Sequence, residues 1–488
     1  MYRQKDDQPE LKDFYLPFGG HLDAKNRWVR YATIVPWKRI ETAYAKLFSE
    51  DGMGAPAKSA RIALGAILIK EKLDITDEET REQIRENPYL QYFIGFEGYR
   101  TEAPFDASMM VHFRKRFGVE ELRMINEWIH EETVKKEKDD GKDGTGGAAG
   151  SENKGKLIID ATCVPQDIQY PTDVRLLNEV REKTEGIIDR LHAPYRGRRK
   201  KPRTYRKKAR KAYLEFCKKR RPKEKDVRRA KREQLGYVRR NLLSINKIIE
   251  SSPLSKLSRR ERRNLMVGHE IYRQQTEMYR ERKHAISGRI VSVSQPHVRP
   301  IVRGKAATEV EFGAKVSVSL VNGFTFVDRI SWEPYNESVC FIEQVEEFRK
   351  RFGCYPESVH VDKIYRTRGN RTYCQEHAIR MSGPKLGRRL IPNDENRGIL
   401  KNQRRMERMD EGIRNAVEGK FGQGKRRFGL GKIFEKLIET SETAIMLGFL
   451  VMNLEKIFKD LIFVFFICYR RAVRYLTYRY YCVVKGCF

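Results

Sequence analysis

A glycine-rich, highly charged segment, residues 138–155, divides this chain into two parts of different character. Its sequence, KDDGKDGTGGAAGSENKG, contains no large apolar side chain and so cannot bury a core of its own. Segments of this composition behave as flexible linkers. A chain of 488 residues is also too long for a single core. We therefore predict an N-terminal domain over residues 1–137 and a larger domain that begins at about residue 156.

The N-terminal domain is predicted to be helical. Apolar residues fill a short helix at 62–69, and Thr76, followed by three acids at 77–79, is typical of a helix cap. The pair Asn87-Pro88 marks a break, and a further helix is predicted from about Ser108.

The larger domain alternates between strand and helix patterns. The run 156–160, KLIID, predicts a buried strand with Asp160 at its C-terminal end. Residues 173–285 then switch to helical periodicity, with two apolar stripes. The first stripe consists of Leu176, Leu177, Val180, Ile187, Ile188 and Leu191, and the second of Leu242, Leu243, Ile245, Ile248 and Ile249.

Strand patterns resume after this helical insertion. Alternating residues at 316–320, the pair Asn322-Gly323 and the run 324–330 predict a tight hairpin. A helix at 336–352, a strand at 358–362 that ends on Asp362, a short strand at 377–381 and a helix at 402–421 follow. The fold class is therefore α/β: a mixed sheet flanked by helices, with a long helical basic insertion at about 173–285 and an all-α N-terminal domain. This domain is expected to span residues 156–452.

The most apolar stretches lie near the C-terminus, at 444–452 and 461–469. Each is about nine residues long and charged residues separate them, whereas a bilayer span needs about 20 apolar residues. We expect a buried helix pair, an apolar and aromatic helical tail at 453–488, and no membrane partner. The charged N-terminus and eight scattered cysteines without a CxxC pair favour a reduced, cytoplasmic compartment.

Charge is concentrated in one segment of the insertion. The chain carries 99 Lys and Arg against 66 Asp and Glu, a formal net charge of +33. Residues 196–232 hold 21 of those cations and three acids, a net of 18. This run, with Arg198, Arg199, Lys200 and Lys201 near its start, favours contact with nucleic acid phosphates. The alternative is a solvated face that binds nothing specific.

Three carboxylates suit phosphodiester chemistry with two divalent cations, Mg²⁺ or Mn²⁺. Such cations prefer hard oxygen ligands, and Asp160, Asp362 and Glu418 are predicted at two strand ends and on a helix. A strand-terminal Asp is also common as a cap or turn residue. Competing acids remain open from the pattern alone, namely Asp167, Asp173 and Asp328.

Cations accompany these acids. Arg414, Glu418 and Lys425 fall within about 40° of one helix face, so that two cations would flank a carboxylate. Because glycines at 419, 422 and 424 are poor helix formers, Lys425 is expected to lie near or beyond the helix end. Arg366 and Arg368 follow Asp362 closely, which favours DNA contact over a solvated turn.

These motifs resemble those of bacterial insertion-sequence transposases of the DDE class. The segment RNAVEGKFGQGK carries Arg414, Glu418 and Lys425 of a Y-x2-R-x3-E-x6-K signature, although Glu411 stands where the signature has Tyr. LIIDAT at 157–162 and VHVDKIY at 359–365 resemble the segments that bear the first two acids. The region around 63–96, with FRKRF at 113–117, is similar to the helical domain that opens many of these proteins.

The resemblance implies an RNase H-like catalytic domain, an N-terminal domain that binds DNA ends, and two metal ions held by Asp160, Asp362 and Glu418. The protein would cut the element's ends, free 3′-hydroxyls and join them to target DNA. Arg414 and Lys425 would hold phosphates. Double-stranded DNA is the implied partner, a homodimer the implied synaptic state, and the bacterial cytoplasm, at the nucleoid, the implied location.

Two other functions stay open: a catalytically inactive DNA-binding relative, which Glu411 weakly favours, and a stand-alone RNase H-like nuclease that cuts without joining. A zinc site is a weaker alternative because its ligands have irregular spacing. Its candidate ligands are Cys354, His360, Cys374 and His377.

Overall fold

The computed structural model describes residues 10–16, 19–48, 56–139, 153–250, 257–305, 308–384, 387 and 396–484, without the side chains of 136–139, 303–305, 308–309 and 462–484. The chain divides into two compact units. The first unit comprises residues 1–164, 316–330 and 336–488, and the second comprises 165–315 and 331–335. Most of the predicted linker lies outside the described residues, so the division into domains at 137 and 156 stays a prediction.

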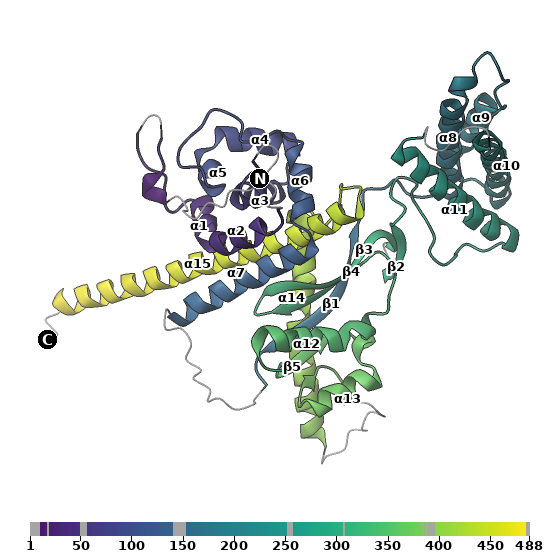
Figure 1. The fold of residues 1–488 in the computed structure, drawn as a ribbon. Coiled ribbons are helices and arrows are strands. Elements are labelled where there is room, and N and C mark those ends of the chain that lie inside the picture. Colours follow the sequence, from purple (N-terminus) through teal and green to yellow (C-terminus); the bar gives the residue numbers. More distant parts are fainter. Residues whose placement is uncertain are drawn as a thin grey trace. The chain divides into compact units, whose positions relative to one another are not determined.

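The N-terminal part of the first unit is helical, as predicted (Figure 1). The predicted cap is confirmed: the Thr76 hydroxyl accepts a hydrogen bond from the Glu79 N–H at 3.2 Å. Ser59 caps the preceding helix, whose apolar face is almost fully buried. The helices are η1 (Leu11–Asp13), α1 (Arg27–Ile34), α2 (Trp37–Ala45), α3 (Ala60–Leu73), α4 (Asp77–Glu86), α5 (Pro88–Phe93), α6 (Met109–Arg116) and α7 (Val119–Asp139).

A six-stranded mixed sheet is present among the described residues, which confirms the predicted α/β class. The strands are β1 (Lys156–Pro165), β2 (Arg299–Lys305), β3 (Thr308–Val321), β4 (Phe324–Ser331), β5 (Ser358–Val361) and β6 (Arg380–Met381). Their order is β2-β3-β1-β5-β6, with β4 paired to β3. β5 pairs in parallel with β1 and β6, whereas β2 and β3 are antiparallel.

The predicted hairpin between β3 and β4 is confirmed. Asn322 and Gly323 connect the strands with φ angles of 49° and 80°, the left-handed backbone that a two-residue turn of this kind requires. The helices predicted at 336–352 and 402–421 are also present, as η4 (Glu337–Cys340) with α12 (Phe341–Phe352) and as α14 (Arg397–Arg427). Two further elements, η5 (Lys363–Tyr365) and α13 (Arg368–Glu376), were not predicted, and α15 (Ile438–Val484) follows α14.

A buried polar network joins the N-terminal helices to the sheet. Asn453 on α15 accepts hydrogen bonds from the N–H and hydroxyl of Thr325 on β4, both at 2.9 Å. Its amide donates to the carbonyl of Thr325 and to Asn126 on α7, both at 2.7 Å. Asn126 itself donates to the Thr325 carbonyl at 3.1 Å. Because α7, β4 and α15 share these bonds, the N-terminal helices pack with β4 in the first unit.

The C-terminal helix pair that the sequence suggested is wrong. One helix, α15, runs through both apolar stretches, because the charged residues between them continue its periodicity rather than end it. Glu455 in that interval accepts a hydrogen bond from the Tyr31 hydroxyl at 2.7 Å and pairs with Lys72, so its charge is compensated within the fold. No helix in the described part of the chain is long and apolar enough to cross a membrane.

The second unit has a hydrophobic core of its own, built from its helices. Both predicted stripes contribute to that core, except that Leu243 is half exposed. The helices are α8 (Asp173–His192), η2 (Ala193–Tyr195), α9 (Arg206–Cys217), α10 (Glu224–Ile249) and α11 (Arg259–Glu281).

Candidate active site

Two of the predicted acids meet where β1 and β5 run side by side. The parallel register pairs Ile158 with His360 and Ile159 with Val361. Asp160 is the next residue of β1 and Asp362 is the residue that follows β5, and neighbouring strands lie about 4.8 Å apart. The register therefore brings the two carboxylates to adjacent positions at one edge of this pairing.

Asp160 lies within β1 rather than at its end, which corrects the prediction. The strand continues to Pro165 because Cys163 and Val164 are buried and extend its apolar pattern. The Asp160 Oδ1 accepts a hydrogen bond from the Ala161 N–H at 2.8 Å. Asp362 directly follows β5, as predicted, and its side chain is exposed.

Burial raises the pKa of Asp160 to about 6. The negative charges of Glu337 and Asp362 raise this pKa further, while the Ala161 N–H and the guanidinium of Arg414 act in the opposite direction. Asp160 is therefore within electrostatic reach of two other carboxylates and one cation. Glu337, on η4, is a member of this group that the sequence analysis missed, since nothing in its local pattern sets it apart from the other acids.

Glu418 and Arg414 face the same side of α14. The Arg414 Nη1 lies 3.1 Å from the Glu418 Oε1, and the Glu418 side chain is 57% exposed. Among the described residues, no group of three or more His, Cys, Asp or Glu side chains is arranged to hold a metal ion. The structure thus brings Asp160 and Asp362 together, and it holds Glu418 in an ion pair with Arg414.

Lys425 lies within α14, which corrects the expected helix end near residue 421. The helix continues to Arg427 because tertiary packing outweighs the poor helix propensity of its glycines. Gly424 allows Leu430 to pack closely against the helix, because a Cβ at this position would lie 2.7 Å from the Leu430 Cδ1. Glu411, at the position of the signature's Tyr, is exposed.

The two arginines after Asp362 differ in their surroundings. The Arg366 Nη2 donates to the carbonyl of Val361 at 2.8 Å, so this guanidinium is bound to the main chain just before Asp362. Arg368 begins α13 and is exposed. Their predicted DNA contact stays a prediction.

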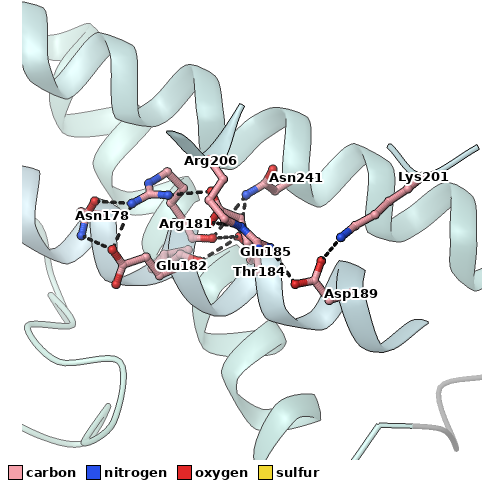
Figure 2. Close-up of polar contacts among 10 residues, drawn as sticks. Asn178, Arg181, Glu182, Thr184, Glu185, Asp189, Lys201, Arg206 and Asn241 are labelled. Atoms are coloured by element: carbon pink, nitrogen blue, oxygen red, sulfur yellow. Dashed lines mark hydrogen bonds and ion pairs between the residues drawn. The ribbon is translucent and has the colours of Figure 1, made fainter. Parts of the chain in front are cut away.

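The start of the basic run is held to α8 by carboxylates (Figure 2). Lys201 pairs with Asp189, and Arg206 pairs with Asp189 at 2.7 Å and with Glu185 at 3.1 Å. Glu185 also binds the fully buried Arg181 at 2.6 Å. The cations ahead of Lys201 in the sequence, Arg198, Arg199 and Lys200, are exposed. This part of the run thus contains both exposed cations and cations that carboxylates hold in place.

The competing acids have other surroundings. Asp173 binds Lys231 and, at 2.6 Å, Arg289 within the second unit. The side chain of Asp328 is 5% exposed, and it accepts hydrogen bonds from Ser319 and Gln344, both at 2.6 Å. Asp167 follows β1 in the second unit.

The zinc alternative gains no support within the described residues. The buried His360 lies between the Ser358 hydroxyl, at 3.1 Å, and the Asp410 carboxylate, at 3.4 Å. The ring of His377 packs against Tyr355 with centroids 4.4 Å apart. Burial raises the pKa of the Cys374 thiol to about 11, which disfavours the thiolate that binds zinc.

Comparison with known proteins identifies two transposase domains in the chain. A family model described as "Transposase DDE domain" matches residues 359–455, which include Asp362 and Glu418, and a model described as "Transposase domain (DUF772)" matches residues 17–116. The chain is 36% identical over 163 residues to "Uncharacterized protein ORF8 in nfe locus" of Rhizobium meliloti; this covers 33% of the chain and 73% of that relative. No solved structure matches significantly.

The two matched domains define this protein as a transposase, and its mixed α/β sheet is consistent with an RNase H-like domain. The chain belongs to the DDE transposase family, whose members generally use divalent metals and bind DNA.

Proposed function

We propose that this protein cuts the ends of an insertion sequence and joins the freed 3′-hydroxyls to target DNA, with Asp160, Asp362 and Glu418 as ligands for two Mg²⁺ or Mn²⁺ ions. The observation that carries the proposal is the parallel β1–β5 register, which makes Asp160 and Asp362 neighbours. Arg414, which pairs with Glu418, lowers the pKa of Asp160 through its charge, and this supports including Glu418 in the proposed site.

The donor set fits hard divalent cations. Asp160, Asp362 and Glu418 supply carboxylate oxygens, the ligands that Mg²⁺ prefers. The pKa of Asp160 is raised by burial and by the charges of Glu337 and Asp362, and a cation beside these groups relieves their mutual repulsion. Divalent cations bound there activate the attacking oxygen and stabilise the leaving oxygen.

The chain's own cations bind and orient the DNA in this proposal. Arg414 holds a phosphate beside the reacting one and offsets charge in the transition state. Lys425 lies farther along α14, seven residues beyond Glu418, and Arg368 at the start of α13 is an exposed cation six residues after Asp362 in the sequence. We assign Arg366 a contact with the same strand. Because two element ends must be joined together, two active sites are needed, which we propose a homodimer supplies.

Replacing Glu418 with Gln should abolish cleavage and joining while leaving DNA binding intact. The amide keeps the shape of the side chain but lacks the charge that a metal ligand needs, so we expect a loss of more than about a hundredfold in the cleavage rate. The assay uses labelled DNA carrying the element's own ends, with Mg²⁺ or Mn²⁺.

The outcomes of that assay separate the candidate functions. Glu407→Gln, on the same helix but hydrogen bonded to Gln403, is the matched control and should cut like the wild type. If the wild type binds DNA but never cuts it, the proposal fails and the protein is a catalytically inactive DNA-binding relative. Glu411 at the signature's Tyr position weakly favours that alternative. If it cuts without forming strand-transfer products, the protein acts as a nuclease.

The basic run should contribute to DNA affinity through counterion release. Replacing Arg198, Arg199 and Lys200 with Gln should reduce the slope of log affinity against log salt by roughly 0.9 for each lost phosphate contact. Arg273→Gln is the control, because two carboxylates, Glu270 and Glu277, already pair with that side chain. Equal slopes for the triple variant and the wild type, measured by a binding titration at several salt concentrations, would remove this segment from the interface.

A further inference from the structure

Asp410 is a buried acid on the helix that carries Glu418. It lies four residues before Arg414 and eight before Glu418, so the three side chains fall within about 80° of one another around α14. Along the described part of the helix, the buried residues are Asp410, Val417, Phe421 and Gly424. Every residue from Arg397 to Met409 is at least partly exposed. Asp410 is therefore the first buried residue along α14.

The carboxylate of Asp410 is bound by groups of the sheet edge. Arg380 on β6 donates two parallel hydrogen bonds to it, both at 2.8 Å. The main-chain N–H of Gly383 is a third donor, and the ring of His360 on β5 lies 3.4 Å away. Burial alone would raise the pKa of Asp410, but the hydrogen bonds and charge of Arg380 outweigh it and hold the pKa below its ordinary value. Two-pronged pairs of this kind fix orientation as well as distance.

The same sheet-edge segment also holds the end of β5. The Ser382 N–H donates to the carbonyl of Val359 at 2.8 Å, and the Ser382 hydroxyl accepts from the Val361 N–H at 3.1 Å. Gly383 has a φ of +94°, and a Cβ there would lie 2.0 Å from the Arg366 Nη1, so the Arg366 guanidinium lies directly on this glycine. Arg366 in turn binds the Val361 carbonyl. Residues 380–383 thus contact both α14 and the residues that lead into Asp362.

We propose that Asp410 is a positioning residue and that its contacts with Arg380 and Gly383, here called the α14 latch, fix the rotation of α14 so that Glu418 faces Asp160 and Asp362. This inference rests on the proposed function. The buried apolar side chains of α14 among the described residues are Val417 and Phe421, and apolar packing is not directional. The latch adds a directional contact two turns ahead of Glu418. Because displacing a reacting group by about 1 Å costs on the order of a hundredfold in rate, the latch bears directly on catalysis.

Replacing Asp410 with Asn should slow DNA cleavage by about 10- to 100-fold with DNA affinity nearly unchanged. The concentration of Mg²⁺ needed for the half-maximal rate should rise, because Glu418 is oriented to bind the metal in a smaller fraction of the molecules. Arg380→Gln should show the same defects. The double variant should be no slower than the slower single variant, since both changes remove one interaction. Arg380→Lys keeps the charge but loses the second hydrogen bond, so its rate should be intermediate.

A second readout does not depend on activity. Amide hydrogen exchange over residues 411–420 should be faster in Asp410→Asn than in the wild type and unchanged in the control Glu407→Gln. Should Asp410→Asn fail to fold by circular dichroism, Arg380→Lys takes its place in both measurements. Unchanged exchange, or a folded variant that cuts at the wild-type rate and Mg²⁺ dependence, overturns the latch.

The two proposals fail in different ways. If the wild type cuts, Glu418→Gln does not, and Asp410→Asn behaves like the wild type, the latch is wrong while the proposed function stands. If Glu418→Gln cuts as fast as the wild type, the proposed function fails, and a latch that positions Glu418 for catalysis fails with it.

Discussion

Replacing Asp160 with Asn should abolish DNA cleavage and, at pH 7, make the folded protein more stable. Burial and the charges of Glu337 and Asp362 raise the pKa of Asp160 to about 6, so the ionised carboxylate is unfavourable in the fold. A pKa change from 3.8 to about 6 corresponds to an upper bound of about 3 kcal/mol, and partial exposure of the side chain lowers this to about 1–2 kcal/mol. Removing the charge should therefore raise the melting temperature by a few degrees.

The stability that Asp160→Asn gains over the wild type should increase with pH. Between pH 3.8 and about 6, folded Asp160 keeps a proton that the unfolded chain has released, so the wild type loses stability as the pH rises through this window. The advantage of Asp160→Asn should be fully present above pH 6 and vanish near pH 4. Thermal unfolding at a series of pH values measures it, and an advantage independent of pH would contradict the assignment.

The same pair of proteins tests the metal proposal. Because ligands that bind only the folded state stabilise it, Mg²⁺ should raise the melting temperature of the wild type. The increase should be smaller in Asp160→Asn. Equal increases in both proteins would place the bound ions away from Asp160.

Replacing Asn453 with Leu should destabilise the first unit by about 3–5 kcal/mol. The change leaves the N–H, hydroxyl and carbonyl of Thr325 without the partner that Asn453 provides, and it removes the bond to Asn126. Asn453 is 1% exposed, so water does not replace these bonds without opening the contact between α7, β4 and α15. Denaturant unfolding measures the loss.

Asn402→Leu is the matched control, since Asn402 is an exposed residue in a helix of the same unit. It should change the free energy of unfolding by no more than about 0.5 kcal/mol. A cost for Asn453→Leu as small as that of the control would mean that the network does not hold the helices to the sheet.

Local patterns predicted the elements that carry the candidate site. The run KLIID and the run that ends at Asp362 are short and apolar, and the Asn322-Gly323 pair specifies a tight turn, so strands and hairpin were identified correctly. Element ends were less predictable. β1 continues past Asp160 and α14 past Gly419, Gly422 and Gly424, because burial of Cys163 and Val164 and the packing of Leu430 on Gly424 are tertiary effects.

Residues that act through partners distant in the sequence had no local signal. Asp410 is bound by Arg380 and Gly383, about thirty residues earlier, and Glu337 raises the pKa of Asp160 from a distant part of the sequence. The continuity of α15 was missed for a related reason. A charged interval of the kind around Glu455 usually ends an apolar segment, but here Tyr31 and Lys72 compensate the charge.

The path of the chain through the sheet also affects how such a protein can diversify. The second unit begins at Pro165, the last residue of β1, and the chain returns to the first unit within β3; these two strands are neighbours in the sheet order. Connecting them needs no long segment, and the unit between them has its own core. Changes in the length or charge of this insertion can therefore leave the register of Asp160 and Asp362 unaltered. Under the function proposed above, the surface that contacts DNA and the acids that carry the chemistry can then evolve at different rates.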